Sequence, residues 1–360
     1  MVHKIEDEDL LFHILNVGFG DNIIVEFPAD GNGQRSYGLV DCYNSGKTKK
    51  YLEKLRNLRS GYTKLKFICA THPHLDHING ILPFLKDKEY QPEEFWDSGF
   101  RHSSSTYLSI LETLLSENIR MIRISSGMEM YFGRVQVTAL APSVALRNRY
   151  ATYGVDVNNA SIVLRFEHHD KPVLMVKSKE FEGASPKEEE REASPAVVIL
   201  AGDAEFDSWS HICQEYPRLE KTVTYLPLVT KIVNYLECSV VKVAHHGSMH
   251  SAPLDIYEKM KPKKAIISSK QKVSDLKVGN RTLRRTLFPH QSAVIALEEI
   301  GAELATTDGS YESMDEDGTS KNLDWAHEGS LVIVVPPGKK PLWKKLNDAV
   351  EETGDPPLEI

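Results

Sequence analysis

The sequence predicts an α/β fold in which two β-sheets are covered by outer helices. Segments with the hydrophobic pattern of strands alternate with segments of helical pattern along the chain. Three of the apolar strand segments end in histidine or aspartate, so their ends can converge on one site. The length of 360 residues and the hydrophobic content of 41% allow a large core, and α/β chains of this size often form one unit. We therefore expect a single domain over residues 1–360.

The first half of the chain predicts strands at residues 11–17, 22–27, 37–41 and 66–70. A charged helix is expected at 47–59, and a further helix at 78–86. A stronger helix is predicted at 104–117, where Ser and Thr supply the start and leucines recur at helical spacing: Leu108, Leu111, Leu114 and Leu115. We interpret these leucines as core residues.

The second half predicts strands at 135–140, 161–166, 172–176, 196–201, 239–244, 265–268 and 303–306, with helices at 206–215 and 291–300. Residues 178–194 are polar, acidic and poor in large apolar side chains, which predicts an exposed loop insertion. A solvated loop is the simpler interpretation, and docking of a protein partner is the alternative. Residues 309–360 are expected to form a peripheral C-terminal segment, with one last strand at 330–335.

A run of metal-ligand residue types follows the apolar segment 66–70. His72, His74, Asp76 and His77 have the pattern H-x-H-x-D-H, and histidine and aspartate are usual ligands for divalent metals. A loop that leaves a strand can fold such residues inward, whereas a strand would point them to opposite faces. The alternative, ordinary core or surface histidines, leaves this crowding unexplained. The run therefore predicts a metal site.

Two later strand segments end in the same residue types. Residues 197–201 lead to Asp203, and residues 240–244 lead to His245 and His246. Three strand ends can therefore bring their ligands together.

The overall charge and the termini exclude several classes of protein. A formal charge of −8 disfavours nonspecific coating of nucleic acid, although a local basic groove can coexist with it. The most basic stretch contains Lys263, Lys264, Lys270, Lys272, Arg281, Arg284 and Arg285, and it is interpreted either as a solvated surface or as a phosphate-binding region. No signal-peptide pattern and no apolar segment of about 20 residues is present, so we expect a cytoplasmic protein without a membrane partner. The four cysteines form no C-x-x-C pair.

These motifs, together with Asp41 at the end of an early strand, resemble the metallo-β-lactamase-fold hydrolases. The closer resemblance is to the hydrolase domain of the bacterial DNA-uptake channel ComEC, because residues 17–21 read V-G-x-G-D and residues 159–161 read N-x-S. The resemblance extends from about residue 11 to about residue 308. It implies an αβ/βα sandwich of two mixed β-sheets flanked by helices.

The resemblance also implies a centre of two divalent metal ions, zinc or manganese. His72 and His74 would hold the first metal, Asp76 and His77 the second, and Asp203 would bridge them. His245 would complete the shell of the second metal. Two cations about 3.5 to 4 Å apart can activate a hydroxide and stabilise both the attacking and the leaving oxygens of a phosphoryl transfer.

The ligand set departs from the family at the first metal, where Asn158 or Asn159 stands in place of a histidine and His168 and His169 lie further along the chain. For catalysis, Asp76 would orient the nucleophilic water. His246 is a candidate proton donor or loop-fixing residue.

His290 is a further catalytic candidate by the resemblance, and Ser248 either contacts a phosphate or caps a helix. Asp41 would support the metal loop without binding metal.

Three functions follow. The favoured one is a metal-dependent phosphodiesterase or nuclease with a nucleic acid substrate. The second is a hydrolase of a small ester, lactone, thioester or lactam, because the fold does not determine the substrate. The third is a metal-poor regulatory or binding subunit that acts with a protein partner in a multi-component system.

Overall fold

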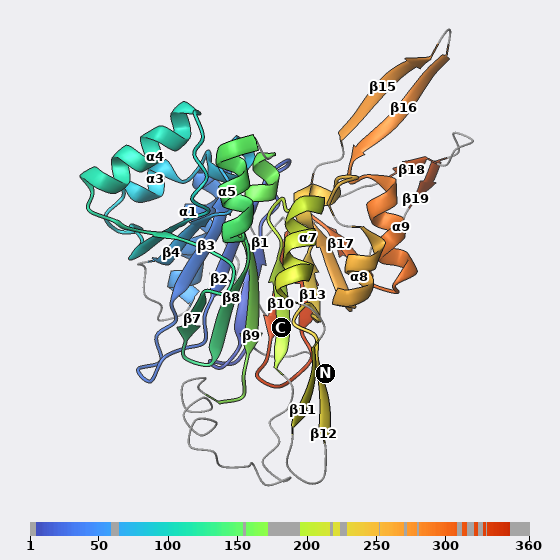
Figure 1. Cartoon of the computed structure of the whole chain (residues 1–360). Coiled ribbons are helices and arrows are strands. Elements are labelled where there is room, and N and C mark those ends of the chain that lie inside the picture. Colours follow the sequence, from blue (N-terminus) through green and yellow to red (C-terminus); the bar gives the residue numbers. More distant parts are fainter. Residues whose placement is uncertain are drawn as a thin grey trace.

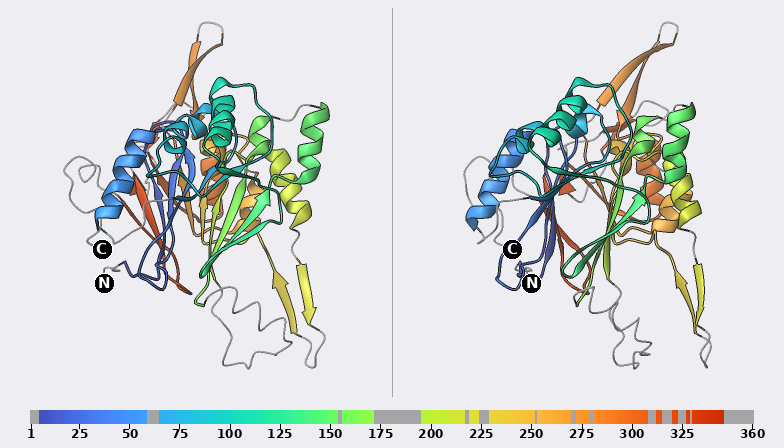
Figure 2. Two further views of the ribbon diagram at one scale, coloured as in Figure 1. Left: turned by 90° about the vertical axis from the view of Figure 1, so that its left-hand side faces the viewer. Right: turned by 60° about the vertical axis from the view of Figure 1, so that its left-hand side comes forward.

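The computed structural model of the chain describes residues 5–58, 65–153, 156–171, 195–216, 219–223, 229–251, 253–269, 272–278, 281–307, 312–314, 320–322, 327–328 and 330–345. Its main body has four layers, with two β-sheets face to face and helices on both outer faces (Figures 1 and 2). This arrangement confirms the predicted α/β sandwich. Among the described residues, no helix has the length and apolarity that a membrane span requires.

The first sheet has eight strands in the order β22-β21-β1-β2-β3-β4-β5-β6. The strands are β1 (Leu10–Ile14), β2 (Asn22–Glu26), β3 (Tyr37–Cys42), β4 (Leu65–Ala70), β5 (Glu94–Asp97), β6 (Arg120–Arg123), β21 (Leu331–Val335) and β22 (Leu342–Lys345). Strands β3 to β6 are parallel, and the remaining neighbours are antiparallel. The sheet is therefore mixed, as expected.

The second sheet has eight strands in the order β20-β17-β14-β13-β10-β9-β8-β7. The strands are β7 (Glu129–Phe132), β8 (Val135–Ala141), β9 (Val163–His168), β10 (Ala196–Leu200), β13 (Val240–Lys242), β14 (Lys264–Ile267), β17 (Glu303–Thr306) and β20 (His327–Glu328). Strands β10, β13, β14, β17 and β20 run parallel, and β7 to β10 pair antiparallel. The carboxyl ends of the parallel strands meet at one edge of a sheet, which is where ligands bind in such folds.

The helices cover the outer faces of the two sheets (Figure 2). They are α1 (Ser45–Leu58), α2 (Leu75–Ile78), α3 (Leu82–Leu85), α4 (Ser105–Ser116), α5 (Val144–Tyr153), α7 (Phe206–Glu215), α8 (Leu254–Met260) and α9 (Gln291–Glu299). One buried apolar cluster lies between the sheets and includes Phe12, Phe67 and Phe166. Two others join a sheet to its helices, through residues such as Leu55 and Trp209. Burial at these three interfaces drives the layers together.

Two expected elements differ in detail. The helix predicted at 78–86 is replaced by two short helices, α2 and α3, and α2 begins three residues earlier at Leu75. The leucines of α4 were predicted to be core residues, yet Leu108 is 47% exposed and Leu115 is 84% exposed. Their side of the helix faces away from the buried Ile110 and Leu114. The prediction was wrong for these two because α4 lies at the edge of the body and buries only one stripe.

The C-terminal region is more central than predicted. Strand β21 pairs with β1 in the first sheet, and all its residues are buried. The expectation of a peripheral segment over 309–360 is therefore wrong for this strand, because the apolar run Leu331–Val335 is long enough to fill a place in the sheet. The strand predicted at 172–176 and the loop at 178–194 lie outside the described residues.

Three hairpins accompany the sheets: β11 (Leu219–Val223) with β12 (Val229–Val233), β15 (Lys272–Val278) with β16 (Arg281–Phe288), and β18 (Glu312–Met314) with β19 (Ser320–Asn322). The β15–β16 hairpin projects from the body, at the top of Figure 1. It contains most of the basic stretch identified in the sequence.

Candidate metal centre

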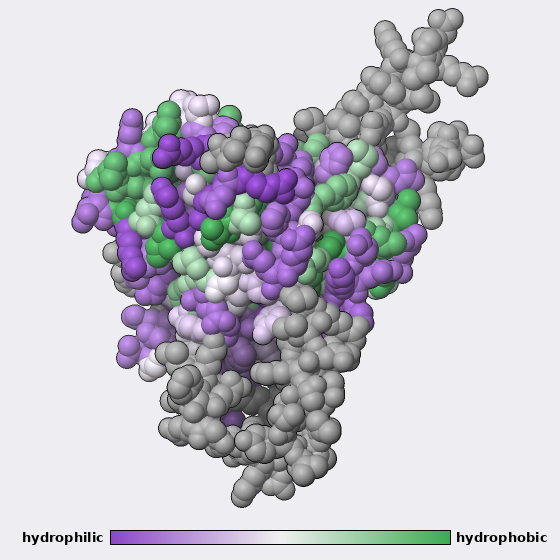
Figure 3. Space-filling view, in the orientation of Figure 1, coloured by the Kyte–Doolittle hydropathy of each residue, from purple (hydrophilic) through white to green (hydrophobic). Residues whose placement is uncertain are grey.

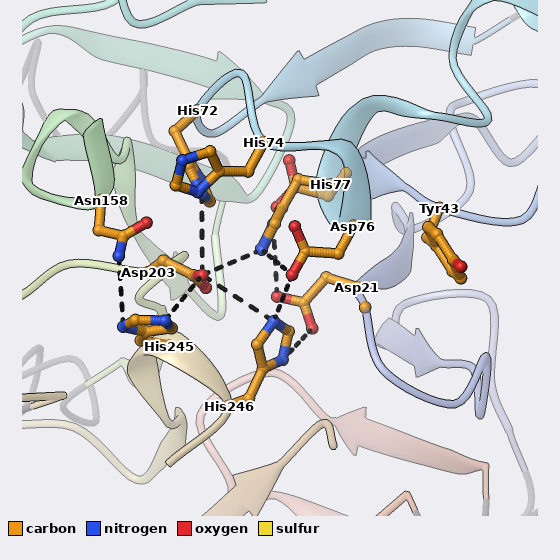
Figure 4. A network of polar contacts seen from close by, with 12 residues as sticks. Asp21, Tyr43, His72, His74, Asp76, His77, Asn158, Asp203, His245 and His246 are labelled. Atoms are coloured by element: carbon orange, nitrogen blue, oxygen red, sulfur yellow. Dashed lines mark hydrogen bonds and ion pairs between the residues drawn. The ribbon is translucent and has the colours of Figure 1, made fainter. Parts of the chain in front are cut away.

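Three strand ends deliver the predicted ligands to one place (Figure 4). His72 and His74 follow β4, and the short helix α2 carries Asp76 and His77. Asp203 follows β10. His245 and His246 follow β13, within the short helical turn η3 (Ala244–Gly247). The convergence predicted from the three apolar segments is therefore present.

Four of these residues form a compact cluster: Asp76, His77, Asp203 and His246. The ligand atoms of the cluster lie within 4.8 Å of one another. Oδ2 of Asp203 is 3.2 Å from Nε2 of His77, and Oδ2 of Asp76 is 3.3 Å from Nε2 of His246. Two carboxylates and two imidazoles at these distances can surround one divalent cation.

A second group of nitrogen atoms shares the Asp203 carboxylate. Nε2 of His72 lies 3.0 Å from Nδ1 of His74 and 3.7 Å from Oδ2 of Asp203. Nε2 of His245 lies 3.9 Å from the same oxygen. We call His72 and His74 the His72 group. The Asp203 carboxylate is therefore shared, since its Oδ2 lies within 4 Å of His72 and also of His77 and His246 in the cluster.

The adjacent histidines 245 and 246 have different surroundings. His246 belongs to the cluster and is fully buried, whereas the side chain of His245 is 18% exposed and bonds Glu205. The prediction placed His245, rather than His246, beside Asp76 and His77. The order is the reverse because both residues have left-handed backbone, with φ of 45° and 52°, which turns the chain sharply after β13. Such conformations are uncommon outside glycine and cluster at functional sites.

Hydrogen bonds on the far side of the rings orient the cluster. Nδ1 of His77 donates to Oδ2 of Asp41 over 2.7 Å, and Nδ1 of His246 donates to the Ser268 carbonyl over 2.6 Å. Each bond leaves the Nε2 lone pair facing the cluster, as in many metal-binding histidines. Asp41 also accepts from the backbone N–H and hydroxyl of Thr71. It therefore supports the loop, as expected, and holds His77 in place.

Several buried polar atoms at this place are left without a hydrogen bond. Within the described part of the chain these include Nε2 of His77, Nε2 of His246, Oδ1 of Asp203 and Oδ1 of Asn158. Buried polar atoms almost always have a hydrogen-bond partner, so several buried atoms at one site without such a partner indicate that a binding partner is missing. A cation in the cluster would accept the lone pairs of His77, His246 and Asp203. The residues present therefore fit a divalent metal.

The charge balance of the cluster also favours a cation. Burial raises the pKa of Asp203, but the imidazoles of His77, His246 and His72 outweigh it and hold the pKa well below its usual range. Burial lowers the pKa of His77, but the carboxylates of Asp203 and Asp41 raise it well above its usual range. Without another cation, the site draws a proton onto His77. The negative potential that does this would equally attract a metal ion.

Behind the cluster lies a second acidic group, formed by Asp21, Asp41 and His77. Here a lysine supplies the cation, because the Lys242 ammonium pairs with Asp21 and both side chains are 1% exposed. The group is therefore compensated from within the protein. Lys242 falls within the strand predicted at 239–244, and its lone charge inside an apolar strand was the available signal.

The two asparagines differ in their contacts. Oδ1 of Asn159 accepts the backbone N–H of Ser208 over 3.0 Å, which leaves it a structural role. Nδ2 of Asn158 donates to Glu205 over 3.1 Å, and its unsatisfied Oδ1 is buried beside the centre (Figure 4). Of the two asparagines, Asn158 is therefore the one beside His245, because its Nδ2 lies 3.5 Å from Nδ1 of that histidine. Glu205, which the sequence analysis assigned no role, bonds both Asn158 and His245.

The remaining candidates are not among the four cluster residues, although the backbone N–H of His290 donates to the Gly247 carbonyl over 2.7 Å. Nδ1 of His290 accepts the backbone N–H of Ser292 and caps helix α9, so its catalytic role stays a prediction. His168 lies in β9 and donates to the Val335 carbonyl, and His169 follows it. Neither is brought to the centre. Ser248 accepts the backbone N–H of His250 and thereby shapes the loop after the histidine pair.

No family model matches the chain, and no curated protein matches it. Solved structures do. A B3 metallo-β-lactamase with an active-site glutamic acid is similar over 56% of this chain and 61% of its own, with 15% identity and a TM-score of 0.30. The SMB-1 metallo-β-lactamase bound to 2-mercaptoethanesulfonate is similar over 66% of this chain and 79% of its own, with 12% identity and a TM-score of 0.34. A diphosphatase of the PhnP family is similar over 78% of this chain and 98% of its own, with 10% identity and a TM-score of 0.34. This chain thus spans about three fifths of the first of these structures.

Proposed function

We propose that this protein is a metal-dependent phosphodiesterase that cleaves nucleic acid with two divalent cations, zinc or manganese. The observation that carries the proposal is the Asp203 carboxylate, which belongs to the cluster and also lies within 4 Å of His72 in the His72 group. The sequence motifs of residues 17–21 and 159–161 further support membership of the ComEC-like branch of the metallo-β-lactamase-fold hydrolases. A cytoplasmic location in bacteria accompanies this proposal.

The ligands follow from the geometry. Nε2 of His72, Nδ1 of His74 and Oδ1 of Asn158 would hold the first cation. Asp76, His77 and His246 would hold the second, and Asp203 would serve both. When bound, such a pair of cations supplies an activated hydroxide and neutralises the charge that develops on a phosphodiester.

The protein supplies orientation and protons. Oδ2 of Asp76 is directed into the cluster and can also hold the attacking water. His245 is the histidine of the pair that reaches solvent, and its Nδ1 is bound by Glu205. Burial lowers the pKa of His245, but the hydrogen bond and charge of Glu205 raise it above its usual value. We therefore assign to His245, instead of the buried His246, the proton that the leaving oxygen requires.

The basic stretch favours a nucleic acid over a small ester. The sequences of strands β15 and β16 contain five lysines and arginines and one aspartate, and the two strands pair in the projecting hairpin. The hairpin ends at the centre, because the Phe288 ring is 5.5 Å from that of His245. A positively charged arm that begins at the metal ligands suits a long polyanion.

The test combines metal analysis with two substrates. Purified protein would be assayed for bound metal and for cleavage of linear DNA and bis-p-nitrophenyl phosphate, with the variants His74→Ala and Asp203→Asn. Asp207→Asn, an exposed change in the first turn of α7, is the matched control. We expect two metals in the wild type and loss of cleavage in both variants but not in the control.

Other outcomes point elsewhere. Two bound metals without cleavage of either substrate would favour a small ester, lactone, thioester or lactam. Substoichiometric metal without cleavage would favour a regulatory subunit that works with a protein partner.

A further inference from the structure

A pocket lies beside the metal centre, at the edge of the first sheet. It has a volume of ≈ 230 Å³ and is bounded by strands β5 and β6, the loop after β5 and helix α4. Its lining residues fall into three kinds, which are basic (Arg101, Arg123, His102), apolar (Leu108, Leu111, Met121) and others (Asp97, Gly99, Tyr107). The pocket has no part in the metal chemistry described above.

One histidine of the pocket, His102, lies beside one histidine of the metal centre, His74. The ring centroid of His102 is 6.2 Å from that of His74, at an interplanar angle of 83°. Nδ1 of His102 accepts the backbone N–H of Ser104 over 3.3 Å. Its Nε2 is therefore the ring nitrogen that carries a hydrogen and can donate to a ligand. A group in the pocket would lie next to one held at His74.

The charges of the pocket favour an anion. Arg101 and Arg123 line the pocket and are both exposed. The one acidic lining residue, Asp97, is 2% exposed and already engaged. Its Oδ1 accepts the backbone N–H of Gly99 over 2.7 Å, and its Oδ2 accepts the Tyr107 hydroxyl over 2.9 Å. Guanidinium groups bind phosphate through paired hydrogen bonds.

The apolar side of the pocket includes one of the exposed leucines of α4. Leu108 of α4 is 47% exposed and Met121 of β6 is 36% exposed, although α4 buries other apolar residues such as Ile110. Figure 3 shows hydrophobic residues gathered on the surface over α4, next to hydrophilic ones. An anion alone would leave this apolar surface unused. A sugar or a base attached to the anion would cover it.

We propose that this pocket binds the nucleotide adjacent to the scissile phosphodiester, with Arg101, Arg123 and His102 on its phosphate and Leu108 and Met121 against its sugar and base. This proposal rests on the proposed function and extends it to substrate selection. The cluster and the His72 group act on one phosphodiester, and the pocket holds the next nucleotide. A substrate that consists of a single phosphodiester would not reach it.

The experiment separates binding in the pocket from reaction at the metals. The probe is a fluorescein-labelled oligothymidylate of ten phosphorothioate-linked nucleotides, and the small substrate is bis-p-nitrophenyl phosphate. The variants are Arg123→Gln and the double change of Arg101→Gln with Arg123→Gln. Arg120→Gln is the matched control, because Arg120 lies on the same strand, is 73% exposed and pairs with Glu94.

We expect the double variant to weaken oligonucleotide binding by about tenfold or more, and to reduce the slope of log affinity against log salt by about 1.4, which is two single-strand phosphate contacts. Hydrolysis of bis-p-nitrophenyl phosphate and the metal content should stay within about twofold of wild type. Arg120→Gln should change none of these quantities.

Two results would overturn the proposal: unchanged oligonucleotide affinity in the double variant, or a loss of bis-p-nitrophenyl phosphate hydrolysis as large as the loss of binding. If the wild type binds metal and hydrolyses no phosphodiester, the proposed function fails. Oligonucleotide binding still decides on the pocket in that case, because the measurement does not require turnover.

Discussion

The ammonium of Lys242 pairs with the carboxylate of Asp21 directly behind the candidate metal centre. The pair joins β13 of the second sheet to the loop before β2 of the first, so it bridges the two halves of the sandwich. Oδ2 of Asp21 also lies 3.8 Å from Nδ1 of His77. The lysine therefore offsets the negative charge that gathers behind the cluster.

Replacing Lys242 with methionine should be strongly destabilising. The change leaves the Asp21 carboxylate buried without its cation, and breaking a buried pair in this way costs about 3–5 kcal/mol. The free energy of unfolding from urea titration measures the effect. Adding Asp21→Asn to the same protein should recover a large part of the loss. Equal stability of Lys242→Met and wild type would contradict the role assigned to the pair.

Replacing Asn158 and replacing Asn159 should have different effects on the number of metal ions bound per chain. Asn158→Ala removes the unsatisfied oxygen that is proposed to hold the first cation, so we expect the protein to retain one metal per chain and lose the other. Asn159→Ala removes the bond to Ser208 and should lower stability by about 1 kcal/mol with both metals retained. Elemental analysis after dialysis gives the two stoichiometries. Two metals in Asn158→Ala would show that another residue completes the first shell.

The loss of activity on replacing the proton donor should depend on the leaving group of the substrate. His245→Gln should slow DNA cleavage by about a hundredfold or more, because an alkoxide needs a proton to leave. Hydrolysis of bis-p-nitrophenyl phosphate should fall much less, since nitrophenolate leaves without one. Glu205→Gln should have a smaller effect in the same direction, and Glu215→Gln, an exposed change on the same helix, none. Equal losses on both substrates would instead identify His245 as a metal ligand.

Metal removal should lower the stability of the fold. A ligand that binds only the folded state adds about 2.7 kcal/mol when its concentration is 100 times Kd. We expect zinc or manganese to raise the melting temperature of chelator-treated protein in a concentration-dependent way. Asp203→Asn should abolish the increase, because it removes the carboxylate between the two metal positions. Thermal unfolding followed by circular dichroism makes the comparison.

Stability should depend on pH through His168. Burial lowers the pKa of this imidazole from 6.5 to about 4, although its bond to the Val335 carbonyl opposes the shift. The unfolded chain therefore binds more protons between these values, and stability is complete above pH 6.5 and lost as the pH falls toward 4. The difference amounts to about 3 kcal/mol.

In His168→Gln this part of the pH dependence should be absent. Unfolding free energies at several pH values between 4 and 7 provide the test, and His250→Gln, which changes an exposed imidazole, is the control. An undiminished slope in His168→Gln would assign the proton uptake to other groups.

The local pattern of the chain predicted many of the elements and the residue types that meet at the centre, but it missed short strands such as β5 and β6 and placed His245 where His246 lies. Helix α7 has the bounds that were predicted, and the strands before His72, Asp203 and His246 lie within about two residues of their expected places. Hydrophobic periodicity and ligand spacing are short-range properties, so they can be recognised in a single sequence. The exposed position of Leu108 could not be recognised in this way. It depends on where the edge of the sheet lies, and that edge is set by which strands lie side by side, which is not a short-range property.

The sequence alone was enough to predict that three strand ends carry residue types that bind metals and that two sheets with outer helices can bring them together. Tertiary packing separates the neighbours: His246 lies in the cluster and His245 beside Glu205, and Asn158 lies toward the centre and Asn159 toward Ser208. The sequence pattern does not distinguish two adjacent histidines, or two adjacent asparagines, from each other. Two left-handed residues in a row and a fixed strand register place their side chains in different surroundings, and those directions exist only once the layers are packed.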